Sequence, residues 1–198
     1  MNRLRNQKGI ALLTVLLVLV IMTVIGIAAI TITGFENRIA GFSRTAESAT
    51  TAAESCLGTA VNIIQHTIDQ GSLPAAFLDN ATPVGPVPQG NAVILNQEIL
   101  GQSNNNVDEA TVAPNTLAVV GGFTVRGDID RLYAKPKAGG SLQFASGYEG
   151  TAGGAAGGGI DILYRVNCVA MNAGTNTTSR ITAVYACTAT GESCQRQI

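Results

Sequence analysis

Residues 10–33 read IALLTVLLVLVIMTVIGIAAITIT, and none of them carries a charge. As a helix rising about 1.5 Å per residue, this stretch spans roughly 36 Å, which is more than the roughly 30 Å of a bilayer's hydrocarbon core. The basic residues before it, Arg3, Arg5 and Lys8, have no acidic residue among them. Positive charge on the N-terminal side alone keeps that end in the cytoplasm. The stretch therefore predicts a membrane-spanning helix followed by an exported domain.

Three interpretations of the boundary before this stretch compete. A cleaved secretory signal, cut near Ile27-Ala28-Ala29, has an apolar region of about 7–15 residues, which is shorter than this one. An uncleaved membrane anchor is the second interpretation. The third starts from Lys8-Gly9-Ile10, where a glycine directly precedes the apolar run. A glycine there suits a peptidase that cuts at the cytoplasmic membrane face and leaves the apolar helix on the mature chain.

A helical pattern continues beyond the apolar stretch. Small or apolar residues recur at steps of three or four, which predicts one buried helix face: Phe42, Ala46, Ala49, Ala53, Cys56, Ala60, Ile64 and Ile68. Gly71 and Pro74 end the pattern. We therefore expect one helix from Ile10 to Gln70, with residues 10–34 in the membrane and residues 35–72 forming an amphipathic half.

Residues 73–198 predict a β-rich head. After an extended, turn-rich segment at 83–88, β-prone runs occupy residues 92–95, 117–125, 129–134, 160–170 and 180–188. The last two runs flank Asn172–Asn176, which is a plausible hairpin loop. We expect an antiparallel sheet laid against the C-terminal half of the helix, an α+β fold. The Gly-rich segment 139–159 predicts a flexible surface loop.

Four cysteines follow the apolar stretch, at Cys56, Cys168, Cys187 and Cys194. None has the C-x-x-C spacing of a zinc site, and a single histidine, His66, cannot complete the usual ligand sets. An even number of cysteines in an exported domain predicts two disulfides, with four reduced thiols as the alternative. Among the three possible connectivities we favour Cys187–Cys194, which closes the shortest loop and leaves Cys56 to pair with Cys168.

The remaining signals for chemistry are weak. Asp128 and Asp130 alternate on a β-prone run and offer oxygen ligands for Ca²⁺, but the other ligands that calcium needs are not evident. We therefore expect these aspartates to serve turn chemistry and solubility. Arg126-Gly127-Asp128 spells an integrin-type tripeptide, which is too short to assign a function. We find no nucleophile–base set, so we expect no enzyme, no cofactor and no metal.

The charge balance bears on the class of partner. The chain has 13 acidic and 12 basic residues, and three of the basic residues precede Gly9. The part that follows Gly9 is therefore mildly acidic. A mildly acidic domain lacks the basic surface with which proteins bind nucleic acids.

Three motifs stand out in the N-terminal third: QKGIALL at residues 7–13, ENRIAG at 36–41 and AAE at 52–54. On these motifs the N-terminal third resembles a minor pilin of the PilX type. A weaker likeness to the closing hairpin of such proteins appears in LYRV and SRIT near the C-terminus. The resemblance implies a prepilin leader over residues 1–9, cleavage after Gly9 by prepilin peptidase, N-methylation of Ile10, and incorporation into a pilus or a pilus-like secretion filament.

One residue departs from the family pattern. Most pilins carry Glu at the fifth mature position, and this chain has Thr14 there. In the family that carboxylate is thought to neutralise the N-terminal amine of the neighbouring subunit ahead, and a missing counter-charge in apolar surroundings is costly. Thr14, with Glu36 and Arg38, is therefore a candidate filament contact, and its lack of charge favours a subunit near the tip.

The resemblance leads to one hypothesis with two alternatives. The hypothesis is a minor pilin that promotes initiation of a type IV pilus, with the inner membrane, the major pilin, other minor pilins and a tip adhesin as partners. Before assembly its N-terminus is cytoplasmic and its head periplasmic, and afterwards it is extracellular. The alternatives are a type II secretion pseudopilin at the tip, and a monomeric membrane-anchored adhesin.

Overall fold

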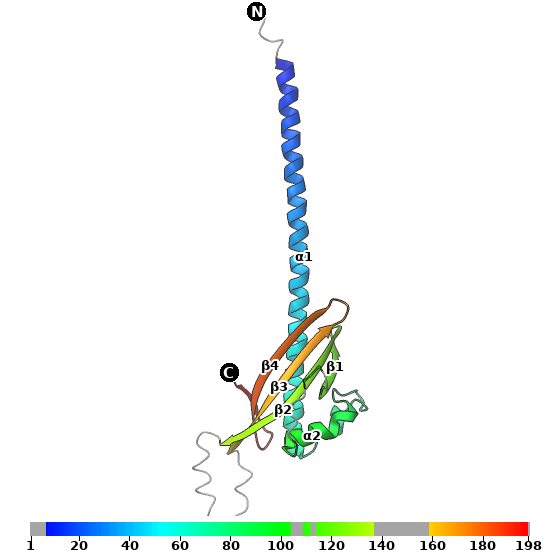
Figure 1. Cartoon of the computed structure of the whole chain (residues 1–198), viewed down its shortest axis with the longest axis vertical. Helices are drawn as coiled ribbons and strands as arrows, with labels where there is room; N and C mark the ends of the chain where they lie inside the picture. Colours follow the sequence, from blue (N-terminus) through cyan, green and yellow to red (C-terminus); the bar gives the residue numbers. More distant parts are fainter. Residues whose placement is uncertain (1–6, 104–108, 112–113, 137–158, 198) are drawn as a thin grey trace, which may run out of the picture. The chain divides into compact units, whose positions relative to one another are not determined.

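A computed structural model describes residues 7–103, 109–111, 114–136 and 159–197. The chain divides into two compact units, Met1–Thr45 and Ala46–Ile198. The helix α1, Gln7–Gln70, contributes residues to both units. The second unit also contains the short helical turns η1 (Ala75–Phe77) and η2 (Gln89–Asn91), the helix α2 (Ala92–Leu100) and five strands (Figure 1).

The long helix forms as the sequence predicts. It remains helical through Gly26, Gly34 and Gly41, where an added Cβ atom would have no neighbour within 4 Å apart from the helix's own backbone. It ends where expected, because Gly71 adopts a positive φ of 65° and donates its N–H to the Ile68 carbonyl. A left-handed residue of this kind is a common helix terminus, and glycine adopts it without steric cost.

The predicted stripe of small residues becomes the buried face of α1 in the second unit. Its buried members occur at steps of one, three and four: Ala49, Ala52, Ala53, Cys56, Leu57, Ala60, Ile63 and Ile64. Phe42 and Ala46 belong to the same stripe but are exposed. A helical residue is buried only where another element covers it, and the buried core begins at Ala49.

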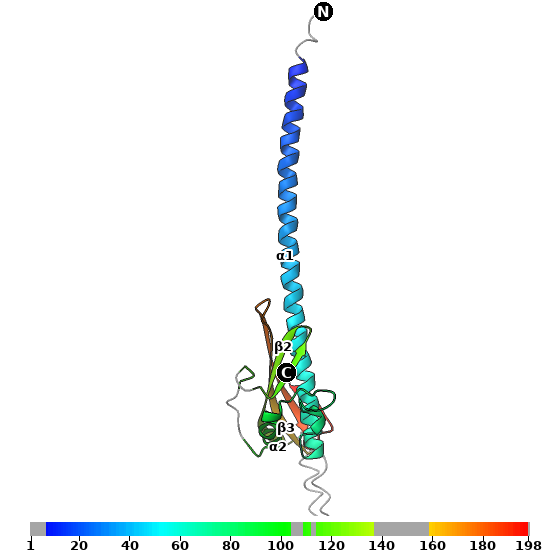
Figure 2. The same ribbon diagram turned by 90° about the vertical axis from the view of Figure 1, so that its right-hand side faces the viewer.

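The five strands form one antiparallel sheet in sequential order (Figure 1). The strands are β1 (Thr116–Val120), β2 (Phe123–Pro136), β3 (Ile160–Asn172), β4 (Thr177–Thr188) and β5 (Cys194–Gln197). Two views show the sheet alongside the C-terminal part of α1 (Figures 1 and 2). The expected α+β arrangement of helix and antiparallel sheet is confirmed, as is the hairpin loop between β3 and β4.

Two of the predicted strands are wrong. The run at 117–125 is a hairpin rather than one strand, because Gly121 and Gly122 adopt φ values of 57° and 83° and turn the chain between β1 and β2. Two successive positive φ angles are the signature of the tight turn that suits a twisted hairpin. The run at 92–95 begins α2, which buries Leu95, Glu98 and Ile99 at helical spacing. Short apolar runs do not by themselves distinguish a strand from a helix.

The core lies between α1 and one face of the sheet. On β3 this face carries Ile162, Tyr164, Val166, Cys168 and Ala170 in strict alternation, and all of them are buried. Alternate residues of a strand point to the same face, so one register places the whole set against the helix. The helix contributes mostly small side chains to this core, among them four buried alanines, Ala49, Ala52, Ala53 and Ala60.

Both predicted disulfides are present. Cys56 on α1 bonds to Cys168 on β3, with 6.0 Å between the two Cα atoms. Cys187 bonds to Cys194 and links the paired strands β4 and β5. The first bridge closes a loop across 112 residues of sequence and fixes the helix to the centre of the sheet. Long closed loops of this kind restrict the unfolded chain most in the chain-entropy model.

The Cys56–Cys168 bridge requires a glycine beside it. Gly127 on β2 pairs with Cys168, and a Cβ atom at Gly127 would lie 2.7 Å from the Cys56 Sγ and would also meet the Thr116 Oγ1. A side chain at this position would displace the helix, the disulfide or β1. The glycine of the Arg-Gly-Asp tripeptide is therefore explained by packing.

Tyr164 joins the sheet to α2. Its buried hydroxyl donates a hydrogen bond of 2.7 Å to the Ile99 carbonyl near the end of that helix. Burial raises the pKa of Tyr164 to about 12, and the positive charge of Arg131 partly offsets this effect. The neutral phenol is therefore part of the folded core.

We expect Gly127→Ala to lower the free energy of unfolding by about 1–3 kcal/mol, the usual cost of overpacking a filled site. Denaturant unfolding of the full chain in detergent measures it. Gly58→Ala is the matched control, since Gly58 lies on α1 with no group within 4 Å of an added Cβ. Alanine there should raise the stability by up to about 1 kcal/mol through helix propensity. Equal stability of Gly127→Ala and the wild type would contradict the packing argument.

Tyr164 also predicts a loss of stability at alkaline pH. A tyrosine with a folded pKa of about 12 stabilises the fold fully below the unfolded value of about 10, and this contribution disappears as the pH rises through about 12. The difference amounts to about 2–3 kcal/mol. Denaturant unfolding from about pH 8 to about pH 12 measures the decline, which should be smaller by that amount in Tyr164→Phe. An identical decline in both proteins would assign the effect to other groups.

Candidate functional site

The N-terminal part of α1 presents apolar side chains on all sides. From Ile10 to Phe42 its large apolar residues are each between 50% and 76% exposed. The helix is long and apolar enough to cross a membrane, with a mean hydropathy of 3.1 in its most apolar window. An apolar surface of this extent is unstable in water and must be covered by lipid or by protein. A membrane anchor meets this requirement.

The threonines of the apolar stretch satisfy their own hydroxyl groups. Thr14 Oγ1 donates a hydrogen bond of 2.9 Å to the Ala11 carbonyl. Thr23, Thr31 and Thr33 bond the carbonyl three or four residues earlier in the same way. A hydroxyl bonded within its own helix has no unsatisfied donor in apolar surroundings. Thr14, the fifth residue after Gly9, is therefore uncharged, and its hydroxyl already donates a hydrogen bond within the helix.

The charged candidates follow the apolar stretch. Glu36 and Arg38 are exposed on α1, and within the described residues neither forms an ion pair. Residues two apart on a helix point in different directions and cannot pair with each other. The structure therefore leaves both charges available to other molecules. Gly9 and Ile10, the predicted cleavage boundary, lie within the first turns of the same helix.

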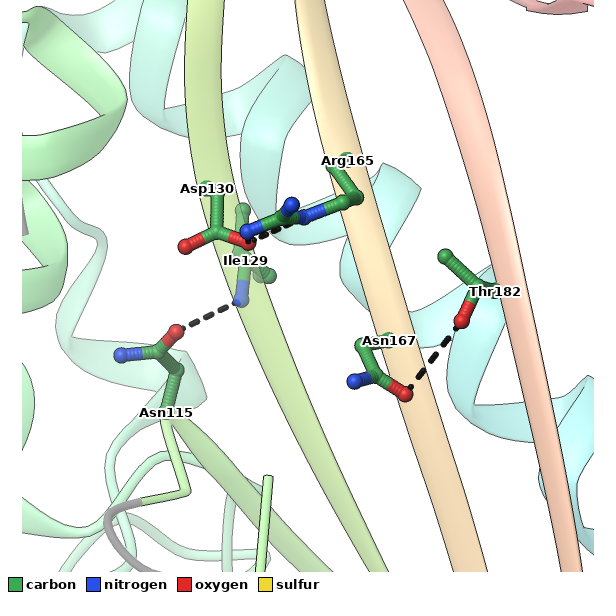
Figure 3. A network of polar contacts seen from close by, with 6 residues as sticks. All are labelled: Asn115, Ile129, Asp130, Arg165, Asn167 and Thr182. Carbon is green, nitrogen blue, oxygen red and sulfur yellow. Dashed lines mark hydrogen bonds and ion pairs between the residues drawn. The ribbon is translucent and has the colours of Figure 1, made fainter. Parts of the chain in front are cut away.

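The interpretation of Asp128 and Asp130 as turn and solubility residues is wrong. Both lie in the middle of β2, and both are almost fully buried. They share one face of the sheet as their spacing predicts, which is the face opposite to the α1 core. Asp130 Oδ2 forms an ion pair of 2.8 Å with Arg165 of β3, which holds it in place. Figure 3 shows the two side chains meeting across the strands.

A row of polar contacts surrounds this ion pair. Asn115 accepts a hydrogen bond of 2.6 Å from the Ile129 N–H where β1 begins, and Asn167 accepts one from Thr182 on β4 (Figure 3). Among the described residues, no group of three or more His, Cys, Asp or Glu side chains gathers in a way that holds a metal ion. These contacts join β2 to β3 and β3 to β4, so they help to organise the sheet.

The Arg-Gly-Asp tripeptide lies within β2 and not in a loop. Arg126 donates to the Thr111 carbonyl, and Gly127 and Asp128 are buried. An exposed loop is the usual place for a recognition tripeptide, and this one lacks that exposure. His66 is exposed, as the sequence indicated, and its ring lies 5.8 Å from that of Phe77. Of the Gly-rich segment 139–159, residues 139–158 lie outside the described residues.

Sequence reasoning missed a groove beside β1. A hollow of about 600 Å³ lies between the segment Val84–Pro88 and β1, and Thr59 of α1 also lines it. Val84 is 77% exposed and Val119 is 76% exposed. The signal was available in the sequence, because Thr116–Val120 is a β-prone run without a charge, and natural edge strands usually carry one.

Comparison with known proteins identifies the N-terminal segment. A family model described as PilX N-terminal matches residues 8–57. No curated protein and no solved structure matches the chain. The matched segment contains the predicted cleavage boundary, the apolar stretch, Glu36 and Arg38, and the first residues of the buried helix face. The match supports a type IV pilus-related pilin of the PilX type.

Proposed function

We propose that this chain, a PilX-type pilin by its N-terminal segment, is a minor subunit that promotes initiation and assembly of a type IV pilus from a position near the tip. The observation that carries the proposal is Thr14 within an exposed, wholly apolar stretch of helix. The Cys56–Cys168 bridge fixes the head to α1, which supports a structural role for the chain.

Thr14 bears on position because of the charge it lacks. When apolar helices pack together, the N-terminal ammonium of one subunit enters surroundings of low dielectric constant, where an unpaired charge costs several kcal/mol. The Thr14 hydroxyl already donates to the Ala11 carbonyl, and it supplies no negative charge to such an ammonium. A subunit with no neighbour ahead of it does not meet this cost. The tip of a filament is such a place.

The proposed life of the chain has two stages. The exposed apolar helix first holds it in the inner membrane, with residues 1–9 cytoplasmic and the head periplasmic. Prepilin peptidase then cleaves after Gly9, the new terminus at Ile10 is methylated, and the helix exchanges lipid for other pilin helices. Glu36 and Arg38 are exposed just past the apolar stretch and supply charges for contacts with the major pilin or with other minor pilins.

The same observation supports a second candidate, a type II secretion pseudopilin at the tip of its filament. An uncharged fifth mature residue suits the tip of either kind of filament. Copurification with sheared pili favours the pilus subunit, and loss of protein secretion with intact pili favours the pseudopilin. Cleavage at Gly9 distinguishes a monomeric membrane-anchored adhesin from both of these candidates, because the adhesin requires no such cleavage.

The mature N-terminus tests the class of protein directly. We expect mass spectrometry of the chain from its native membrane to find N-methylated Ile10 as the first residue. Replacing Gly9 should leave the leader attached, because glycine offers the peptidase an unobstructed backbone. A mature chain that retains Met1, or one that begins near Thr31, would rule out the pilin assignment.

The position within the filament is tested at Thr14. We expect Thr14→Glu to increase severalfold the amount of this chain in sheared filaments, relative to its amount in whole cells, because a carboxylate pairs with the neighbouring ammonium. Thr14→Val, which is similar in shape and uncharged, should leave that ratio unchanged. Quantitative mass spectrometry of sheared filaments measures both. Wild-type protein at the abundance of a major subunit would contradict a position near the tip.

A further inference from the structure

The strand β1 leaves an apolar edge of the sheet open. It is the first strand in the sheet order, and among the strands of the described residues only β2 pairs with it. Its sequence TLAVV contains no charged residue and no proline. Leu117 is 44% exposed and Val119 is 76% exposed. Natural proteins usually protect such an edge with charges, prolines or bulges, because it can pair with another chain.

The backbone of β1 has hydrogen-bonding groups directed away from β2. The Leu117 N–H donates a hydrogen bond of 2.6 Å to the Pro86 carbonyl, so it points outward from the sheet. Residues two apart in a strand repeat this direction, so the N–H and C=O of Val119 also point outward. Within the described residues the Val119 groups have no partner. Within the described residues, the edge therefore makes one backbone hydrogen bond with its own chain, at Leu117, and leaves the N–H and C=O of Val119 open.

The opposite wall of the groove is held firmly. Val87 is fully buried and donates its N–H to the Phe77 carbonyl, and Gly85 donates to the Leu78 carbonyl. A Cβ atom at Gly85 would collide with the backbone of Phe77, so the two segments are in close contact. A groove with a fixed wall needs little reorganisation to receive a ligand.

The groove has one charged lining residue. Asp79 accepts a hydrogen bond of 3.1 Å from the Gln89 N–H through Oδ1 and is otherwise exposed. The remaining lining residues are apolar or uncharged. A ligand that complements this groove carries apolar side chains along most of its length and a positive charge at one end.

We infer that this groove binds an extended segment of a partner protein, which adds to the sheet beside β1, places Val or Leu side chains against Val84 and Val119, and sets a Lys or Arg against Asp79. Strand addition of this kind takes its affinity from backbone hydrogen bonds and its specificity from alternate side chains. The inference concerns the head alone and does not depend on the role of Thr14.

The loop that lines the groove favours a single extended segment over a second copy of this sheet. Because the Pro86 carbonyl already occupies the edge at Leu117, a second sheet cannot pair along the whole of β1. A single chain can enter beside Val119 and follow the groove. Thr59 of α1 then lies beneath it.

A peptide of defined chemistry tests the inference. The probe is a fluorescein-labelled peptide of about eight residues, long enough for a typical strand, with alternating Val and Thr and one terminal Lys. Fluorescence anisotropy with the full chain in detergent should show saturable binding. Val119→Pro removes the outward N–H at an edge position where proline is tolerated, and should weaken binding about tenfold. Unchanged thermal unfolding verifies that this variant is folded.

Matched variants separate the groove from the general surface. Val119→Lys should weaken binding about tenfold, and Val93→Lys, at a valine of α2 that is 65% exposed and outside the groove, should not. Asp79→Asn keeps an acceptor for Gln89 and should weaken binding of the Lys peptide about threefold, but not binding of a peptide with Gln in place of Lys.

Three outcomes would overturn the inference. One is the absence of saturable binding to the wild-type chain. Another is equal binding by the wild type, Val119→Pro and Val119→Lys. The third is concentration-dependent self-association of the chain that Val119→Pro abolishes, because the edge would then be covered by a second copy.

Discussion

The contact between the small-residue face of α1 and the centre of the sheet determines the arrangement of the head. Ala49, Ala53 and Ala60 are fully buried in the core that the helix shares with the sheet. Gly127 leaves room for the Cys56–Cys168 bridge that fixes this contact. Larger side chains on α1 would hold the helix away from the sheet. The small residues of the helix and the glycine on β2 therefore belong to the same packing arrangement.

The same helix meets a different requirement at its N-terminal end. There its side chains are large and apolar on all sides, and the described chain offers nothing to cover them. Lipid and neighbouring apolar helices are two surroundings that suit such a surface. One helix can therefore serve as membrane anchor, as filament core and as the support of the head. The Thr14 hydroxyl shows how a polar residue fits this environment without a partner outside its own helix.

Two regions of the head differ in how their polar groups are paired: the sheet face opposite to α1, and the edge of the sheet at β1. On the face of the sheet opposite to α1, polar side chains pair across neighbouring strands, as Asp130 Oδ2 and Arg165 do. Arg165 keeps 40% of its side chain exposed, so its partner is buried while the pair remains accessible from one side. The β1 edge, in contrast, combines open backbone groups with apolar side chains. The β1 edge is therefore the better surface for binding another chain, because its open backbone groups gain hydrogen bonds when a partner strand adds to it.

The sequence by itself determined the long helix, its end at Gly71 and the β3–β4 hairpin, and it favoured the disulfide pairing that the structure has. The first three features depend on local signals: an uncharged apolar run, a spacing of three and four, a glycine where the helical pattern ends, and a turn-rich segment between two β-prone runs. It also determined the likeness to a PilX-type pilin through residues that the family match covers. Local signals survive because few distant contacts compete with them.

Only the tertiary structure decided the remaining features. The run at 92–95 became a helix because Leu95 and Ile99 are buried together, which short apolar patterns do not reveal. Asp130 became an ion-pair partner because the register of β2 and β3 places Arg165 opposite to it. The groove exists because Pro86, distant in sequence, bonds to Leu117. Each of these features depends on contacts between residues that are distant in sequence, and local sequence patterns do not specify such contacts.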